Sequence, residues 1–159
     1  MRESGLVCAD ILEELCRAAK PGVTTLELDL LARRLIAKHN VQSAFLGYYD
    51  YPAVICASIN SVIVHGIPRK EDILKSGDII GLDFGIFKNG FCADTARTVI
   101  IGSASDEDRS LVADTQRSLQ LAIDLCHVDN RLGDLGAAVQ NYAESKGYGV
   151  VRDFVGHGI

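Results

Sequence analysis

Two strand-like runs around Lys88-Asn89-Gly90 constrain the fold of this chain more than any other feature of its sequence. Residues 79–87 and 91–101 are rich in β-branched and aromatic side chains, which favour strands. The Asn-Gly pair between the two runs is a strong signal for a tight turn. The sequence therefore predicts an antiparallel β-hairpin.

Two acidic residues, Asp83 and Asp94, lie on this predicted hairpin. If Lys88-Asn89 forms the turn, the two aspartates are direct cross-strand partners. If Asn89-Gly90 forms the turn, Asp94 faces Gly85 and Asp83 lies diagonally from it. Either turn places both carboxylates on one face of the sheet, whereas a three-residue loop would separate them.

Two carboxylates held this close repel each other, and a shared proton or a bound cation would offset that repulsion. Small residues on the same face leave room for such a cation: Gly81, Gly85, Cys92 and Ala96. The alternative is that one aspartate pairs with Arg97 while the other faces solvent. Arg97 is three positions from Asp94, so on a regular strand it points to the opposite face. Both interpretations stay open on the pattern alone.

Helical and extended segments flank the hairpin. Apolar residues at helical spacing predict helices over residues 2–19, 25–38, 106–126 and 131–146. Thr24 with Glu27 and Ser105 with Asp108 provide N-terminal caps for the second and third helices. Strand-like runs are predicted at residues 54–57, 61–64 and 149–155.

Composition excludes several classes of protein. The formal net charge of −5 argues against a nucleic-acid partner, because a nucleic-acid binder normally carries a basic stripe. Five cysteines without a C-x-x-C pair favour a reducing compartment over a disulfide framework. No apolar run approaches the roughly 18 residues that span a bilayer. We therefore expect a cytoplasmic protein with no membrane partner.

Two histidines, His65 and His157, are each flanked by glycine. Glycine beside a histidine lets backbone and ligand approach closely, and imidazole is a common catalytic and metal-binding group. A single histidine is nevertheless more often structural, so this pattern alone does not assign a role.

Several segments together resemble the type I methionine aminopeptidases. They are Lys20-Pro21-Gly22-Val23, Phe45-Leu46-Gly47-Tyr48, residues 60–68 (NSVIVHGIP), residues 77–83 (GDIIGLD), residues 90–95 (GFCADT) and residues 150–159 (VVRDFVGHGI). The intervals between His65, Asp83, Asp94 and His157 are 18, 11 and 63 positions, which match the family without gaps. Parts of the hairpin also look like the related prolidase branch, but Val64-His65-Gly66-Ile67-Pro68 favours the methionine branch.

The resemblance implies a pita-bread fold of the α/β (α+β) class, built from two pseudo-symmetric halves around a dinuclear metal site. The chain would be a single domain over residues 1–159. Residues 1–102 would form the first pseudo-repeat, and residues 103–159 would supply two helices and one strand of the second.

In such a site, Asp83 would chelate one divalent ion, Asp94 would bridge two ions and His157 would bind the other. Divalent cobalt, manganese, iron or zinc suits carboxylate and imidazole ligands. The resemblance also implies that His65 contacts the scissile group of the substrate. Phe45, Tyr48, Tyr51 and Cys56 would hold the methionine side chain of a peptide or nascent-chain N-terminus.

The family completes its site with two glutamates on later strands, and a chain that ends at Ile159 lacks those positions. We therefore expect reduced or absent metal binding and weak catalysis. The alternative is a non-catalytic half-fold that binds peptide N-termini, or that self-associates as a homo-oligomer covering its open sheet edge.

Overall fold

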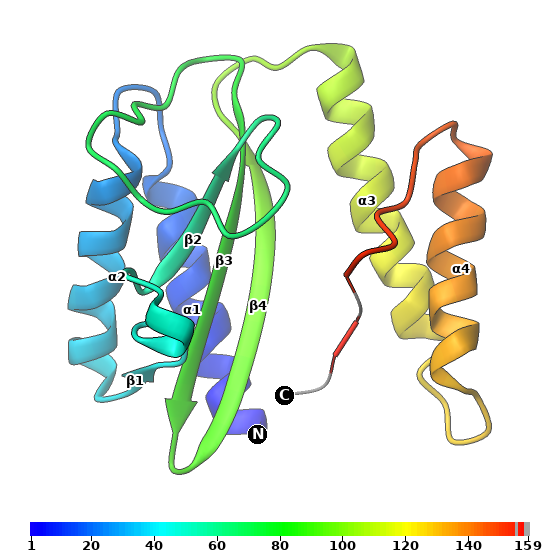
Figure 1. Ribbon diagram of the computed structural model, residues 1–159, viewed down its shortest axis with the longest axis horizontal. Coiled ribbons are helices and arrows are strands. Elements are labelled where there is room, and N and C mark those ends of the chain that lie inside the picture. Colours follow the sequence, from blue (N-terminus) through cyan, green and yellow to red (C-terminus); the bar gives the residue numbers. More distant parts are fainter. Residues whose placement is uncertain (155, 158–159) are drawn as a thin grey trace. The chain divides into compact units, whose positions relative to one another are not determined.

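The computed structural model describes residues 1–154, 156 and 157, and it divides into two compact units. Met1–Ala104 forms a sheet covered by helices, and the second unit, which begins at Ser105, contains a pair of helices (Figure 1). This division falls close to the predicted boundary after residue 102. The pseudo-symmetry of the two halves stays a prediction.

The predicted hairpin consists of β3 (Ile79–Lys88) and β4 (Phe91–Ile100). Lys88 is the cross-strand partner of Phe91, so the turn is Asn89-Gly90. Both turn residues adopt left-handed backbone angles, with φ of 51° and 80°. This is the mirror-image turn that Asn-Gly favours, because its twist matches that of the strands. The second of the two predicted registers is therefore confirmed.

The antiparallel sheet is organised around β3 (Figure 1). β4 pairs with one edge of β3 along its whole length. The other edge is shared by β2 (Ile55–Ile59) and the short β1 (Gln42–Ser43), which pair with opposite ends of β3. The predicted strand at residues 54–57 is thus confirmed with a small shift in its bounds.

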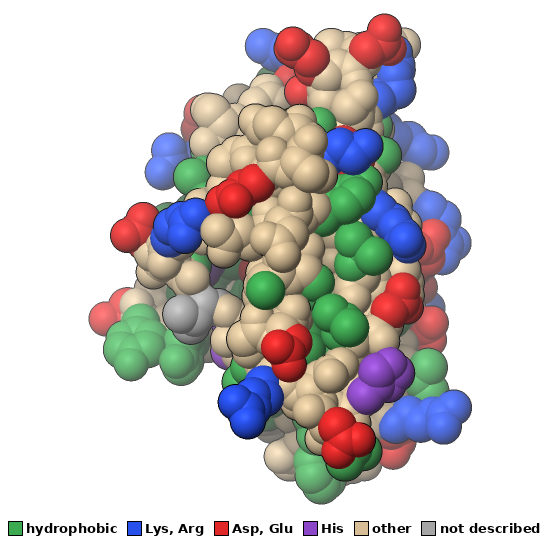
Figure 2. All heavy atoms as spheres, turned by 90° about the vertical axis from the view of Figure 1, so that its right-hand side faces the viewer, with side chains coloured by type: hydrophobic (Ala, Val, Ile, Leu, Met, Phe, Trp, Pro, Cys, Tyr) green, Lys and Arg blue, Asp and Glu red, His purple; other side chains and the backbone are tan. Residues whose placement is uncertain are grey.

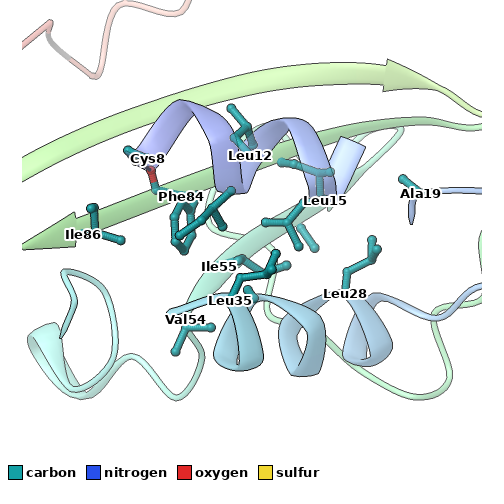
Figure 3. Packing of buried hydrophobic residues seen from close by; sticks show 14 of the residues in the cluster. Cys8, Leu12, Leu15, Ala19, Leu28, Leu35, Val54, Ile55, Phe84 and Ile86 are labelled. Atoms are coloured by element: carbon teal, nitrogen blue, oxygen red, sulfur yellow. Dashed lines mark hydrogen bonds between the residues drawn. The ribbon is translucent and has the colours of Figure 1, made fainter. Parts of the chain in front are cut away.

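The core of the first unit lies between one face of the sheet and two helices, α1 (Arg2–Ala18) and α2 (Thr25–His39). Figure 3 shows side chains of both helices converging on Phe84 and Ile86 of β3 and on Ile55 of β2. Alternate residues of β3 supply the apolar stripe, and all are fully buried: Ile80, Leu82, Phe84 and Ile86. Burial of this face leaves the other face of the sheet for the site.

The N-terminus of α2 carries the predicted capping box. Thr24 Oγ1 accepts a hydrogen bond from the Glu27 N–H at 3.1 Å, and the Glu27 carboxylate accepts one from the Thr24 N–H at 2.7 Å. The reciprocal pair satisfies two backbone donors that the first helical turn leaves without partners.

The second unit contains α3 (Asp106–Asp124) and α4 (Leu132–Ser145), which pack against each other. Asp114 on α3 accepts hydrogen bonds from the hydroxyls of Tyr142 at 2.7 Å and Tyr148 at 3.3 Å. Figure 2 shows acidic and basic side chains interspersed with hydrophobic ones on the face it presents. Within the described part of the chain, no helix is long and apolar enough to cross a membrane.

Two predicted strands are wrong within the described residues. Residues 61–64 form a loop, because Asn60 takes a left-handed φ of 51° and turns the chain away from the sheet at the end of β2. Residues 149–154 pair with no strand and are irregular, and Val155 lies outside the described residues. A strand-like composition does not form a strand without a neighbouring edge to pair with.

Candidate active site

Asp83 and Asp94 lie on the face of the sheet opposite the core, here called the aspartate face. Asp94 is the direct cross-strand partner of Gly85, so Asp83 is its diagonal neighbour. Asp83 is half-buried and Asp94 is exposed. The prediction that one face carries both carboxylates is confirmed.

Arg97 lies on the other side of the sheet, where it forms an ion pair with Glu13 of α1. The alternative in which Arg97 neutralises one of the two aspartates is therefore wrong. The physical reason is the regular alternation of β4, which separates residues three positions apart onto opposite faces.

Phe45 reaches the aspartate face through Gly85. A Cβ atom placed on Gly85 would lie 2.7 Å from the Phe45 ring and 3.2 Å from the Ala44 Cβ. The Ala44 N–H also donates to the Gly85 carbonyl at 2.9 Å, which fixes the segment against β3. The missing side chain of Gly85 is thus the space that the aromatic ring occupies.

Cys56 is the cross-strand partner of Asp83 from β2, and it is buried. The pKa of its thiol is raised to about 11, chiefly by burial; the Tyr51 hydroxyl opposes this rise, and the Asp83 and Asp94 carboxylates add to it. Cys56 therefore stays a neutral thiol and gives the aspartate face an uncharged, polarizable border.

The negative potential of the aspartate pair acts on Cys92, on the same face, and on Cys8 of α1. Burial raises the pKa of Cys8 to about 12 and raises that of Cys92, and in both cases the Asp94 carboxylate adds to the effect. Two nearby carboxylates that disfavour further negative charge are a donor set suited to a divalent cation. The residues present therefore fit such an ion.

A complete ligand set is not assembled by the described residues, among which no group of three or more His, Cys, Asp or Glu side chains is arranged to hold a metal. His157 belongs to the second unit and is exposed. Its predicted approach to Asp83 and Asp94 stays a prediction.

Tyr51 lies beside Cys56 with its hydroxyl directed at the backbone. The hydroxyl is 3.0 Å from the Ile55 carbonyl and 3.1 Å from the Gly66 carbonyl. Burial is the main cause that raises the pKa of Tyr51 above its ordinary value, and the Cys56 thiol contributes. The phenol is therefore a hydrogen-bond donor at every physiological pH.

His65 lies in the loop between β2 and β3 and is exposed. The residue after it, Gly66, docks on β2: its carbonyl accepts from the Ala57 N–H at 2.8 Å, and its N–H donates to Ser58 Oγ at 3.1 Å. Ser58 lies two residues after Cys56, so both side chains are on the aspartate face. This contact holds His65 at the border of that face.

Ser58 was not predicted from the sequence, although its alternation with Cys56 in a β-type run was the available signal. His65 and Gly66 also line a cavity of about 590 Å³ under the loop, together with Asn60, Arg69 and Lys75 among others. Neither Asp83 nor Asp94 lines this cavity. We therefore take the aspartate face, and not the cavity, as the centre of the site.

Tyr48 is the one of the four predicted pocket residues that is exposed. It begins the short 3₁₀ helix Tyr48–Asp50 and is 67% exposed. Its ring packs edge-to-face with that of Tyr49 at a centroid distance of 4.7 Å. Phe45, Tyr51 and Cys56 are thus brought to the aspartate face, whereas Tyr48 is tied to Phe45 and Tyr51 through its backbone and its ring stays exposed.

Comparisons with known proteins all indicate the same family. The profile of metallopeptidase family M24 matches residues 1–159. A methionine aminopeptidase from Clostridium acetobutylicum is 47% identical over the whole chain, and one from Clostridium perfringens is 43% identical. The chain spans 64% of the length of each of these relatives.

The structure is likewise similar to that of a methionine aminopeptidase from Thermotoga maritima, with a TM-score of 0.97 at 36% identity. The match covers 100% of this chain and 64% of the solved one. The predicted pita-bread fold of the α/β class is therefore confirmed, over that part of it which the chain spans.

Proposed function

The chain belongs to metallopeptidase family M24, and from this premise we propose that it acts on polypeptide N-termini as a divalent-metal aminopeptidase that removes methionine. One observation carries the proposal: Asp83 and Asp94 share a face with Cys56 and the Phe45 ring. A pair of carboxylates beside an apolar, sulfur-containing border suits a metal-assisted reaction on a substrate with an apolar side chain.

The metal ligands in this proposal are Asp83, Asp94 and His157. The chemistry of the set suits cobalt, manganese, iron or zinc. Such ions supply Lewis acidity, which polarises a scissile carbonyl and lowers the pKa of water. The aspartates would also orient the free amino group of the substrate, because a carboxylate attracts an ammonium group.

The other proposed residues bind and orient the substrate. Phe45, Tyr48, Tyr51 and Cys56 would surround the methionine side chain, whose thioether packs favourably against aromatic rings. His65 would form a hydrogen bond with the scissile amide. A well-placed polar group in this role contributes about 10²–10⁴-fold to the rate.

The test is hydrolysis of a short peptide that begins with Met, in the presence of Mn²⁺ or Co²⁺. The measured quantity is the release of free methionine. Turnover that is lost in a His65→Ala variant, with metal affinity unchanged, supports the proposal. An equal loss of metal affinity would instead make His65 a ligand.

A second candidate function is binding without turnover. Among the described strands, β4 pairs only with β3, so its other edge offers backbone groups for pairing with another chain. Peptide binding with no release of methionine, or a dimer in sedimentation that blocks this edge, would favour this candidate.

All five cysteines are free thiols, which supports our proposal of a cytoplasmic location.

A further inference from the structure

The loop that carries His65 has no helix or strand of its own between β2 and β3. His65 takes a left-handed φ of 58°, a conformation that is disfavoured for residues other than glycine. Such a residue keeps its conformation only where its surroundings hold it in place. The contacts of the next residue, Gly66, therefore decide how the imidazole is presented.

Gly66 is held by three hydrogen bonds, and one of them comes from a distant side chain. Its carbonyl accepts from the Ala57 N–H at 2.8 Å, and its N–H donates to Ser58 Oγ at 3.1 Å. The third partner is the Tyr51 hydroxyl, 3.1 Å from the same carbonyl. A Cβ on Gly66 would lie 2.2 Å from the Ala57 carbonyl oxygen, which shows how closely the loop approaches β2.

The Tyr51 hydroxyl lies between two carbonyls, that of Gly66 in the loop and that of Ile55 in β2. It thus joins the His65 loop to the strand that bears Cys56 from outside both segments, whereas Ser58, the other hydroxyl that contacts Gly66, belongs to that strand. Tyr51 is half-buried and borders Cys56, so the same residue also lies at the proposed substrate pocket.

From this geometry we propose that Tyr51 is a positioning residue for His65, which acts through the Gly66 carbonyl, in addition to lining the substrate pocket. The inference rests on the proposed function for its kinetic consequence, because His65 acts on substrate only there. Its structural part, the fixing of the loop by the hydroxyl, is independent of activity.

The test compares Tyr51→Phe with Tyr49→Phe. The first variant keeps the ring and removes only the bridging hydroxyl. The second removes the hydroxyl of a neighbouring tyrosine that is 89% exposed, and so serves as the matched control. In Tyr51→Phe we expect the amide of Ala57 to exchange hydrogen about 10-fold faster and the His65 imidazole resonance to shift. Neither should change in the control, and unchanged signals in Tyr51→Phe would overturn the proposal.

The kinetic arm measures hydrolysis of a Met-initiated peptide. Tyr51→Phe should lower kcat about 10-fold or more while KM changes less than about twofold, because the ring that lines the pocket remains. In a His65→Ala background the same change should have no further effect on kcat, since its target is absent. Additive losses, or a rise in KM alone, would make Tyr51 a substrate contact only. If the wild-type chain releases no methionine, the proposed function fails, and the exchange and resonance measurements still decide the positioning role.

Discussion

Asp94 faces Gly85 across the β3–β4 ladder, and Gly85 is the residue against which the Phe45 ring packs. The Asp94 carboxylate, which could bind a cation, and the Phe45 ring, which could contact an apolar side chain, are therefore close together. They are close because Gly85, which lies between them, has no side chain. The left-handed Asn89-Gly90 turn sets this pairing, since a shift of one residue would place Asp94 opposite a different partner.

Replacing Gly85 by alanine should displace the Phe45 ring, because the new Cβ would lie 2.7 Å from a ring carbon. Crowding of this kind costs about 1–3 kcal/mol in a well-packed site. We expect that loss in the free energy of unfolding by chemical denaturation. The same substitution in a Phe45→Ala background should cost much less, because the contact is gone.

The matched control is Gly5→Ala in α1, where a Cβ would meet no atom within 4 Å. Alanine is the better helix former, so this change should stabilise the chain slightly. If both glycine variants behave alike, the crowding at Gly85 is not the cause of its effect.

Removing either aspartate should weaken binding of a divalent ion. Asp83→Asn and Asp94→Asn each keep the size of the side chain but remove a negative charge from the aspartate face. We expect the affinity for Mn²⁺, measured by calorimetry, to fall by at least about 10–100-fold, the loss that even outer-shell partners produce. Asp10→Asn, on the exposed side of α1, is the control and should bind Mn²⁺ as the parent chain does. Equal affinities in all four proteins would exclude the aspartates as ligands.

Asp29 is a buried carboxylate that connects α2 to the segment before β2. It accepts hydrogen bonds from the Val54 N–H and from Arg33 Nε, both at 2.7 Å. Asp29→Ala leaves the buried Val54 N–H without its acceptor, which should lower the free energy of unfolding by about 1–3 kcal/mol. Asp29→Asn keeps an acceptor oxygen and should lose less. A loss of equal size in both variants would indicate that charge, and not the hydrogen bond to Val54, is the stabilising feature.

Local features of the fold were predictable from the sequence, because their causes lie within a few residues. Asn89-Gly90 determines the hairpin through its own backbone preferences, and Thr24 with Glu27 determines the start of α2. The shared face of Asp83 and Asp94 follows from that hairpin by simple alternation.

Long-range features were not predictable in the same way. Residues 61–64 have strand-forming composition, but the loop that they begin docks on β2 through Gly66, whose approach depends on Ala57 and Ser58. The path of the Tyr51 hydroxyl to the Gly66 carbonyl spans 15 positions, and no local pattern signals it. Alternation places a side chain on a face, whereas contacts between loops depend on the packed structure.

Cys8 makes the stability of the chain sensitive to alkaline pH. Its thiol is buried against the backbone of the hairpin, 3.2 Å from the Phe84 carbonyl, and burial raises its pKa from 9.0 to about 12. Between these values the unfolded chain loses the thiol proton while the folded chain keeps it. The free energy of unfolding should therefore fall as the pH rises above about 9, by at most about 1.4 kcal/mol per pH unit for one such group.

The comparison that isolates this effect is the pH dependence of unfolding for the parent chain and for Cys8→Ala. The variant has lower stability at pH 7, because it loses buried contacts, but its decline between about pH 9 and 11 should be shallower by up to one proton equivalent. Other groups with raised pKa values, among them Cys16, Cys56, Cys92 and Tyr51, contribute to the remaining slope in both proteins. Parallel curves for the two proteins would contradict this prediction, because they would mean that the Cys8 thiol ionises as readily in the folded chain as in the unfolded one.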